Sequence, residues 1–386
     1  MKIALVYDAL FPYVKGGGER RYFELARRLR SRHDVHMISW QYWPGSARVV
    51  IDGVTHHGAG KPPAFYGTDG RRRVSEAASF AARSLPILLR ERFDIIDCAS
   101  VPFLPLFSVA LASRLRGARF VATWFEFWDA YWLTYRSGIS ARLARFAERT
   151  AVRVGDAHIA ISQTTADRMA ARRPWRTPVA VIEPGADIEM LSSLPDMPKT
   201  VDVVFAGRLN AQKNVALLLH ALAEAHHRGT RITCAILGDG PERERLTEMA
   251  HDLALSDHVT FLGRIEDDRE YFAHIKQARL FAWPSVAEGF GIAPLEAMAC
   301  GVPPVIAASV FSATQQLVQH GETGVVVTAE PGALARVMQD LLEDEGVLRG
   351  MGAAAVARAK RSTWDAMALA VERVYEDVAA RRPLRL

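Results

Sequence analysis

The chain has 386 residues, of which 49% are hydrophobic and 24% charged, and its formal net charge is +5. This composition is typical of a soluble globular protein and excludes a mainly disordered chain, while the length favours two domains at about 100–200 residues each. The three cysteines, Cys98, Cys234 and Cys300, are far apart, which fits neither a disulfide framework nor a zinc cluster and predicts a reducing compartment.

The net charge is divided unequally along the chain. Residues 1–186 carry a formal charge of +12, and residues 187–386 carry −7. A basic half can face anionic lipid or a phosphorylated partner, and the alternative that stays open is a solvated, arginine-rich surface. The charge pattern predicts no nucleic-acid partner, because the basic half lacks interleaved reading motifs.

The first half alternates short apolar runs with amphipathic segments. This alternation predicts a parallel sheet whose faces are covered by helices. The expected strands are residues 3–7, 35–39, 94–97, 120–123, 158–162 and 179–182, and the expected helices include residues 21–30 and 107–115.

A segment with little periodicity, residues 187–200, contains Pro195 and Pro198, and the alternation restarts after it. The sequence therefore predicts an α/β protein with two doubly wound, Rossmann-like domains facing a cleft, over residues 1–186 and 187–362. An amphipathic helix over residues 363–380 lies in the last segment, 363–386. In the second domain the expected strands are 201–205, 232–237, 259–261, 280–283 and 305–307, and the expected helices are 217–225 and 242–253.

The most informative motif reads E-G-F-G-I-A-P-L-E over residues 288–296 and follows the expected strand 280–283. Gly289 and Gly291 let the backbone approach a ligand closely, and a helix that begins after them offers free N–H groups to an anion or to sugar hydroxyls. Glu288 on the loop and Glu296 on the helix can accept hydrogen bonds from a sugar and a ribose. The alternative is two surface glutamates beside a structural turn.

This block, with its E-(seven residues)-E spacing, resembles the signature of the retaining family 4 glycosyltransferases, which have the GT-B fold. The resemblance implies a C-terminal helix that crosses back to the first domain. Two positions depart from the family pattern, because Asn214 and Pro184 replace a common glycine and asparagine. Further matching segments are Gly207-Arg208-Leu209 with Lys213, Gly238-Asp239-Gly240-Pro241, Phe261-Leu262-Gly263 and Gly16-Gly17-Gly18-Glu19.

The chemistry of these residues fits a nucleotide-diphosphate sugar as donor. Arg208 and Lys213 can neutralise the charge that develops on the departing diphosphate, so we expect neither a metal nor another cofactor. The resemblance implies that Glu288 binds hydroxyls of the donor sugar and Glu296 the ribose, and that the transfer retains the anomeric configuration by front-face attack. It places the rest of the donor site at Gly16, Gly17, Gly18, Gly207, Gly263, Gly289, Phe290, Gly291 and Ile292.

One segment of the first domain departs from the family pattern T-x-H-[DE], since it reads Thr123-Trp124-Phe125-Glu126. Phe125 then occupies the position of a histidine that contacts the donor sugar near its C6 hydroxyl. Phenylalanine donates no hydrogen bond, so we hypothesise a 6-deoxysugar or pentose donor. A shifted register, compensation by Glu126 and loss of activity stay open as alternatives.

An aromatic stretch surrounds this segment, and it predicts an acceptor side formed by Trp124, Phe125, Glu126 and Trp128. Aromatic faces stack on sugar rings or sit at a membrane interface, and the alternative is a hydrophobic helix docked in the core.

Four arginines downstream form a stripe on one side of an expected helix, within about 80°. The stripe could bind phosphates of a lipid or of an acceptor, or remain a solvated face. We therefore expect an anionic or lipid-linked acceptor, and a cytoplasmic protein that contacts the membrane peripherally. The arginines are Arg142, Arg145, Arg149 and Arg153, and the residues expected to face inward beside them are Leu143, Ala147, Ala151 and Val154.

The interpretation is a glycosyltransferase of glycan, glycolipid or natural-product biosynthesis. A nucleotide-sugar epimerase and a phosphorylase share the expected architecture and stay open as alternatives. A non-catalytic protein that binds sugar nucleotides stays open as well, because Phe125 replaces the usual histidine.

Overall fold

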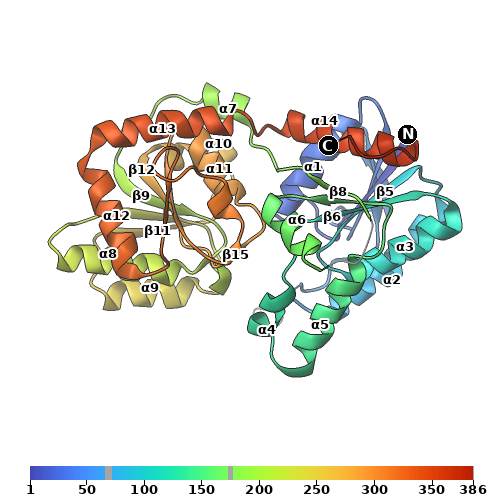
Figure 1. The fold of residues 1–386 in the computed structure, drawn as a ribbon, viewed down its shortest axis with the longest axis horizontal. Coiled ribbons are helices and arrows are strands. Elements are labelled where there is room, and N and C mark those ends of the chain that lie inside the picture. Colours follow the sequence, from blue (N-terminus) through green and yellow to red (C-terminus); the bar gives the residue numbers. More distant parts are fainter. Residues whose placement is uncertain (66–71, 173–176, 386) are drawn as a thin grey trace. The chain divides into compact units, whose positions relative to one another are not determined.

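The computed structural model describes residues 1–65, 72–172 and 177–385, and within them the chain forms two compact units (Figure 1). Unit 1 combines Met1–Gly185 with Trp364–Leu386, and unit 2 is Ala186–Thr363. Each unit has a sheet with helices on its faces, so the predicted α/β class with parallel sheets is confirmed.

In the described part of unit 1, eight strands form one sheet in the order β3-β4-β2-β1-β5-β6-β7-β8. Neighbouring strands are parallel except for the antiparallel pair β3 and β4 at one edge. The central strands are buried almost throughout because helices cover both faces, which explains their apolar runs. The strands are β1 (Lys2–Val6), β2 (Asp34–Ser39), β3 (Arg48–Ile51), β4 (Val54–Gly58), β5 (Ile95–Ala99), β6 (Arg119–Trp124), β7 (Ala157–Ala160) and β8 (Val179–Val181).

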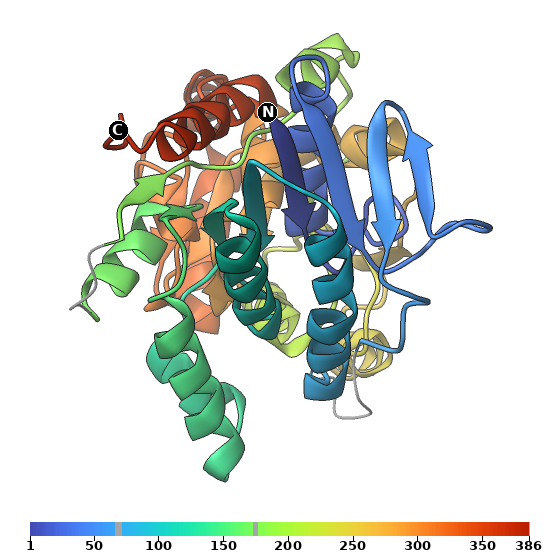
Figure 2. The ribbon, with the colours of Figure 1, turned by 90° about the vertical axis from the view of Figure 1, so that its right-hand side faces the viewer.

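The helices of unit 1 pack on both sides of this sheet (Figure 2). Helices α2 and α3 pack against each other, whereas α1 packs against α14 from the end of the chain. The helices are α1 (Gly17–Leu29), α2 (Val74–Arg90), α3 (Leu104–Arg116), α4 (Trp132–Tyr135), α5 (Gly138–Ala151), α6 (Gln163–Ala170) and α14 (Trp364–Ala379), with a 3₁₀ turn η1 (Asp129–Tyr131) before α4.

A buried carboxylate ties α14 to the middle of the unit 1 sheet. Asp97 on β5 accepts hydrogen bonds from the hydroxyls of Tyr22 on α1, at 2.7 Å, and Tyr375 on α14, at 2.5 Å. Burial raises the pKa of Asp97, and the two tyrosine hydroxyls and Thr123 oppose that rise. A second interaction holds α14 near α1: the Arg32 guanidinium pairs with the Glu372 carboxylate on α14 at 2.6 Å.

In the described residues of unit 2, six strands form a wholly parallel sheet in the order β11-β10-β9-β12-β14-β16. A second, two-stranded sheet pairs β13 with β15. The strands are β9 (Val201–Ala206), β10 (Cys234–Leu237), β11 (Val259–Gly263), β12 (Ala278–Trp283), β13 (Ala287–Glu288), β14 (Pro304–Ala307), β15 (Phe311–Ser312) and β16 (Val325–Val327).

The helices of unit 2 complete a doubly wound fold. Helix α8 is buried on most of its surface and packs against α12, which itself contacts β14 and β16 of the sheet. The helical segments are α7 (Ile188–Ser193), η2 (Ala211–Lys213), α8 (Val215–His227), α9 (Arg243–Asp252), α10 (Asp268–Lys276), α11 (Ile292–Ala299), η3 (Thr314–Gln316), α12 (Pro331–Glu343) and α13 (Glu345–Ala359). No helix within the described ranges has both the length and the apolar character needed to cross a membrane.

The first prediction concerns the buried histidine His158 on β7. Its ring accepts a hydrogen bond from Trp124 Nε1 at 3.1 Å and donates one to the Val152 carbonyl at 2.9 Å, and burial lowers its pKa to about 4. The unfolded chain takes up a proton below about pH 6.5 while the folded ring stays neutral. The stability due to this site is therefore complete above pH 6.5, and about 3 kcal/mol of it is lost as the pH falls towards 4.

This pH dependence is measured by urea unfolding between about pH 7.5 and 4.5. His158→Gln should flatten the fall in unfolding free energy relative to the unsubstituted chain. His251→Gln, at an exposed position on α9, should leave the slope unchanged. Equal slopes for His158→Gln and the unsubstituted chain would contradict the assignment.

Candidate functional site

The strand order of unit 2 creates a switch point between β9 and β12. The chain proceeds from β9 to β10 and β11 on one side, and then returns to place β12, β14 and β16 on the other. In open parallel sheets, ligands bind outside the carboxyl ends of the strands at such a point. Gly207 follows β9 and Trp283 ends β12, so the fold brings the 207–213 segment and the 288–296 block to the same edge.

An ion pair joins these two segments. Lys213 Nζ lies 2.5 Å from Glu288 Oε2, and both side chains are less than one-fifth exposed. The same ammonium lies 4.4 Å from the ring centroid of Trp283, a cation–π contact that fixes its position further. Ser285 Oγ donates a second hydrogen bond, of 3.3 Å, to Glu288 Oε2. The edge thus holds a cation and an anion side by side.

At this edge, the segment after β9 and the G-D-G-P turn after β10 pack closely, backbone against backbone. A Cβ on Gly238 would lie 2.0 Å from the Gly207 carbonyl oxygen, and one on Gly240 would lie 2.3 Å from the Leu209 carbonyl oxygen. The G-D-G-P turn therefore packs directly on the segment after β9, and the Leu209 N–H donates to the Asp239 carbonyl at 3.0 Å. These glycines are required by the close approach of two backbones.

Gly263 of the predicted donor site and Asn214, which departs from the family pattern, lie near these backbone contacts. Gly263 ends β11 in the left-handed region, with φ +75°, and its carbonyl accepts a hydrogen bond from the Gly238 N–H. Asn214 is also left-handed, with φ +50°, which explains why asparagine can replace the family's usual glycine there. Arg208 is exposed at the start of the loop, next to Gly207.

Helix α11 begins at this edge. Gly291 is its N-cap residue with φ +105°, and a Cβ there would lie 2.6 Å from Thr314 Cγ2. Ile292 is the first helical residue, and Phe290 before it is buried. No side chain caps the helix, so its first N–H groups remain available to an anion.

The two predicted carboxylates of this block belong to different elements. Glu288 lies on β13, where its carbonyl accepts a hydrogen bond of 2.7 Å from the Ala313 N–H, and Gly289 follows it as a buried residue. Glu296 lies one turn into α11 and is half-buried. Desolvation raises the pKa of the nearby Tyr271, and the charge of Glu296 adds to that rise. The ion pair with Lys213 involves Glu288.

The glycine turn predicted in the first domain lies in unit 1 after β1. Gly16 is the extended N-cap residue of α1, and Gly17 and Gly18 form its first turn. A Cβ on Gly18 would lie 2.8 Å from the Tyr7 hydroxyl and 3.2 Å from the Phe125 ring. Phe125 is therefore in contact with the glycine turn.

Phe125 also belongs to an aromatic cluster beneath that turn. Its ring centroid lies 5.7 Å from that of Tyr7 and 6.0 Å from that of Tyr22, the latter in an edge-to-face arrangement. The ring is half-buried. The structure thus gives Phe125 a packing role and leaves part of its ring exposed beside α1.

One predicted acceptor-side residue is not accessible. Trp124 is completely buried at the end of β6, where Nε1 donates to His158 and the ring packs against Phe127. Its inclusion among the acceptor-contacting residues was wrong, because the strand directs this indole into the core. Glu126 and Trp128 are half-buried and hydrogen-bond to each other.

The aromatic stretch is held in place by a buried glutamate on α5. The backbone N–H groups of Trp128 and Asp129 donate to Glu148 at 2.8 and 2.6 Å. Burial raises the pKa of Glu148 to about 7, and these two N–H donors oppose the rise. Trp128 stacks against Trp132 with ring centroids 4.6 Å apart, so the stretch is a packed cluster joined to α5.

The four arginines predicted to form one stripe do not all have the same role. Arg145 and Arg149 both pair with Asp129 at 2.8 Å, and Arg172 pairs with the same carboxylate. Burial raises the pKa of Asp129, but the hydrogen bonds from Arg145 and Arg149 outweigh this effect and hold the pKa at about 2. Two of the four arginines therefore stabilise the turn before α4. The expectation that Leu143 faces inward was wrong, because its side chain is 62% exposed.

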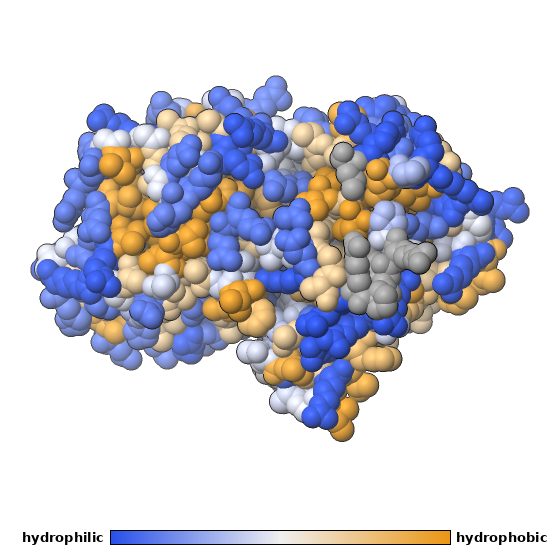
Figure 3. Space-filling view, in the orientation of Figure 1, coloured by the Kyte–Doolittle hydropathy of each residue, from blue (hydrophilic) through white to orange (hydrophobic). Residues whose placement is uncertain are grey.

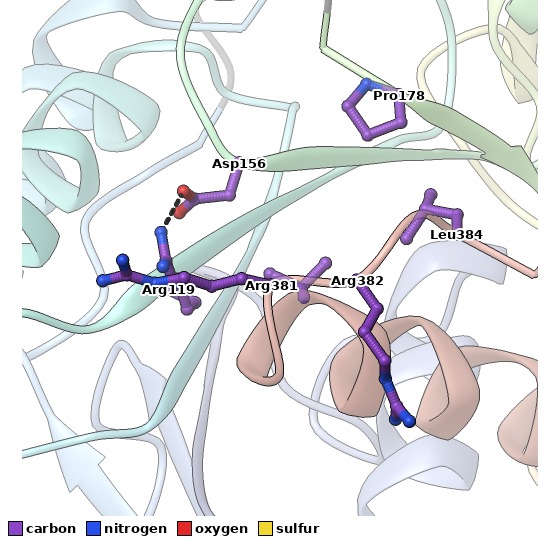
Figure 4. A pocket seen from close by; sticks show the side chains of 7 residues that line it. Arg119, Asp156, Pro178, Arg381, Arg382 and Leu384 are labelled. Carbon is purple, nitrogen blue, oxygen red and sulfur yellow. Dashed lines mark hydrogen bonds and ion pairs between the residues drawn. The ribbon is translucent and has the colours of Figure 1, made fainter.

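A hollow of about 400 Å³ lies elsewhere in unit 1 (Figure 4). Arg119 and Asp156 pair across part of it at 2.9 Å. It lies where β6 and β8 begin, at the opposite sheet edge from Phe125, so it is separate from the predicted site. Its lining residues are Arg119, Asp156, Pro178, Val378, Arg381, Arg382 and Leu384.

Three residues of the unit 2 edge were not singled out from the sequence. Trp283 orients Lys213, Ser285 donates to Glu288, and Thr314 packs against Gly291. Trp283 could have been identified as a site residue from its position, because it is an aromatic residue at the end of the strand before the 288–296 block. In the described ranges, no group of three or more His, Cys, Asp or Glu side chains is arranged to hold a metal ion.

The two halves of the chain match two family models. Residues 192–358 match the model described as glycosyl transferases group 1, and residues 15–190 match the model described as Glycosyltransferase Family 4. The chain belongs to glycosyltransferase family 4. The resemblance on which the sequence interpretation rests is thereby confirmed.

Individual relatives cover only part of this family 4 chain. A D-inositol 3-phosphate glycosyltransferase from Streptomyces bingchenggensis is 33% identical over 220 residues, which are 52% of this chain and 48% of that relative. A GDP-mannose-dependent alpha-(1-6)-phosphatidylinositol monomannoside mannosyltransferase from Mycolicibacterium smegmatis is 32% identical over 230 residues, 55% of this chain and 59% of the relative. The chain thus spans about half the length of the curated relatives it matches.

The likeness in fold extends over the whole chain. The structure of sucrose-phosphate synthase from Thermosynechococcus elongatus superposes with a TM-score of 0.81, covering 98% of this chain and 99% of that one at 19% identity. This similarity confirms the predicted GT-B fold with two Rossmann-like domains.

The second prediction concerns Gly291 at the start of α11. An alanine there would adopt a left-handed conformation and place its Cβ against Thr314, so we expect Gly291→Ala to lower the free energy of unfolding by about 1–3 kcal/mol. Urea unfolding at neutral pH measures the difference. Gly350→Ala on α13, where a Cβ meets nothing within 4 Å, is the matched control and should not destabilise. Equal stability of Gly291→Ala and the unsubstituted chain would contradict the strain assigned here.

Proposed function

We propose that this chain is a retaining, metal-independent glycosyltransferase that moves a sugar from a nucleotide-diphosphate donor to an acceptor hydroxyl. The observation that carries the proposal is the Lys213–Glu288 pair, 2.5 Å apart at the carboxyl edge of the unit 2 sheet and next to the uncapped start of α11. An ammonium, a carboxylate and free N–H groups at one edge are suited to a diphosphate with a sugar attached.

In the proposed mechanism, Lys213 and Arg208 neutralise the charge that develops on the diphosphate as the sugar–oxygen bond breaks. The first N–H groups of α11 add their dipole at the same place. The leaving phosphate oxygen accepts the proton of the acceptor hydroxyl on the face from which it departs. The new glycosidic bond therefore forms with retention of configuration.

Glu288 fits a binding role in this mechanism better than a nucleophilic one. Its carboxylate is engaged by Lys213 and by Ser285, so its charge is balanced and its orientation is set before the donor arrives. A carboxylate in this state can accept hydrogen bonds from donor sugar hydroxyls. Glu296, one turn into α11, is proposed to bind the ribose.

We propose an anionic or lipid-linked acceptor and a peripheral membrane contact through unit 1. The basic character of residues 1–186 supports both parts of this proposal. The names of two relatives support it as well, since one acts on an inositol phosphate and the other on a phosphatidylinositol mannoside.

The donor is proposed to be a 6-deoxysugar or a pentose. Phe125 offers an apolar, partly exposed ring beside the glycine turn of α1, at the position that the family pattern T-x-H-[DE] gives to a histidine. An aromatic edge suits a methyl group or an unsubstituted ring position and leaves a C6 hydroxyl without a hydrogen bond.

The third prediction tests the Lys213–Glu288 pair. We expect Lys213→Ala and Glu288→Gln to lower the rate of transfer about a hundredfold or more, because a charged partner of the donor is lost.

The donor for this assay is identified by a melting-temperature screen of UDP, GDP, ADP and dTDP and their sugars. A nucleotide or nucleotide sugar that binds should raise the melting temperature.

Two matched controls separate this effect from a change in surface charge. Lys360→Ala, just after the end of α13, and Glu248→Gln, on α9, alter exposed side chains and should transfer at the unsubstituted rate. Transfer that survives in Lys213→Ala would refute the assignment of the site. A retained anomeric configuration in the product, determined by NMR, is the expected stereochemical outcome.

The fourth prediction tests the donor sugar. The unsubstituted chain should use a 6-deoxy donor faster than its 6-hydroxylated counterpart on the same nucleotide. Phe125→His restores a hydrogen-bond donor and should shift that ratio about tenfold towards the 6-hydroxylated sugar. Phe125→Leu keeps the position apolar and should preserve the ratio. A clear preference of the unsubstituted chain for the 6-hydroxylated donor would exclude the hypothesis.

A further inference from the structure

Helix α5 exposes a face of large apolar side chains. Ile139, Leu143 and Phe146 are 74%, 62% and 68% exposed. At about 100° per residue, all three lie within about 60° of one another around the helix. A surface leucine by itself needs no explanation, but three such residues on one side of a 14-residue helix form a continuous apolar stripe.

The opposite side of α5 fixes this orientation. Ala141, Glu148 and Ala151 are buried, and Glu148 accepts the two backbone hydrogen bonds from the turn before α4. Rotation of the helix to hide the apolar stripe would expose these groups and break those bonds. The stripe is therefore held towards solvent by the interactions on the other side of the helix.

The apolar stripe is accompanied by positive charge. Arg142 and Arg153 are exposed, and no ion pair involves either of them within the part of the chain that the structure describes. The single acidic residue of α4 and α5 in this described segment is the buried Glu148. Leu133 on α4 adds a further apolar side chain that is half exposed.

Helices α4 and α5 project from the rest of unit 1 (Figures 1 and 2). The space-filling view shows hydrophobic and hydrophilic residues next to each other on this projection (Figure 3). An apolar stripe flanked by arginines and lacking exposed acidic groups is the pattern of helices that lie in the interface of an anionic membrane.

We propose that α5 is the segment through which this protein docks on an anionic membrane surface. Ile139, Leu143 and Phe146 enter the boundary between head groups and acyl chains. Arg142 on α5 and Arg153, which lies two residues beyond the end of α5, contact lipid phosphates. The proposal deepens the membrane contact proposed above, on which it rests, by assigning that contact to one helix face. The charge argues for lipid over a second copy of the chain, because two copies would bring like-charged arginines together.

The experiment measures co-sedimentation of the full chain with vesicles of phosphatidylcholine, alone or mixed with phosphatidylglycerol. Binding to the mixed vesicles should exceed binding to the neutral ones and should weaken with salt. Ile139→Gln/Leu143→Gln/Phe146→Gln should lower partitioning about a hundredfold. Arg142→Gln/Arg153→Gln should lower it about fivefold per arginine, on the mixed vesicles only.

The matched control is Val50→Gln/Val347→Gln/Leu369→Gln, which makes the same change at exposed apolar positions away from α4 and α5. It should bind vesicles like the unsubstituted chain. Circular dichroism and the melting temperature establish that each variant is folded.

Three outcomes would overturn the docking proposal. The unsubstituted chain could fail to bind the mixed vesicles, or the α5 triple variant could bind them as the control does. Sedimentation velocity without lipid could instead show a dimer that the triple variant abolishes, which would assign the stripe to a contact between copies. Stabilisation by nucleotide sugars is measured on the same samples, and its absence would contradict the proposed transferase function while leaving the vesicle result intact.

Discussion

The pairing of Lys213 with Glu288 connects the end of β9 with the segment after β12. Without it, an ammonium and a carboxylate would each lie at a crowded, partly desolvated edge with an unbalanced charge, which is costly. The glycine contacts beneath and the indole of Trp283 beside the pair keep the two groups close together. The strands, the turns and α11 at this edge therefore hold the Lys213 ammonium and the Glu288 carboxylate in fixed positions before any ligand binds.

Much of the fold could be predicted because its strands are buried on both faces, and such strands produce apolar runs that mark their own positions. The same property explains the error at Trp124. In a strand whose two faces are both covered, side chains on either face are buried. The alternation of residues along such a strand therefore does not show which side chains a ligand can reach. The edge strand β3 and its neighbour β4 were missed because their partly exposed residues form no such run.

The candidate site could be predicted in part for a related reason. Glycines at close backbone approaches and a charged pair beside them are encoded locally, so Gly207, Lys213 and Glu288 could be identified. The shared partner of Arg145 and Arg149 could not, because Asp129 reaches them only through a turn with φ +41° that Glu148, on the same helix as the two arginines, holds by a hydrogen bond. Of the residues expected to face inward on this helix, Ala151 is buried, whereas Leu143 is exposed because the buried face is centred on Glu148 and Ala141.

The hydrogen bond from Tyr375 to Asp97 has a consequence for the synthesis of the chain. Unit 1 is discontinuous, so its first 185 residues leave the ribosome long before the helix that completes them. Until residues 364–379 emerge, the Asp97 carboxylate has its hydrogen bonds from Tyr22 and Thr123 but lacks the one from Tyr375, and α1 lacks its covering helix. Unit 2, which is continuous, can finish folding before that helix emerges, and unit 1 is completed only afterwards.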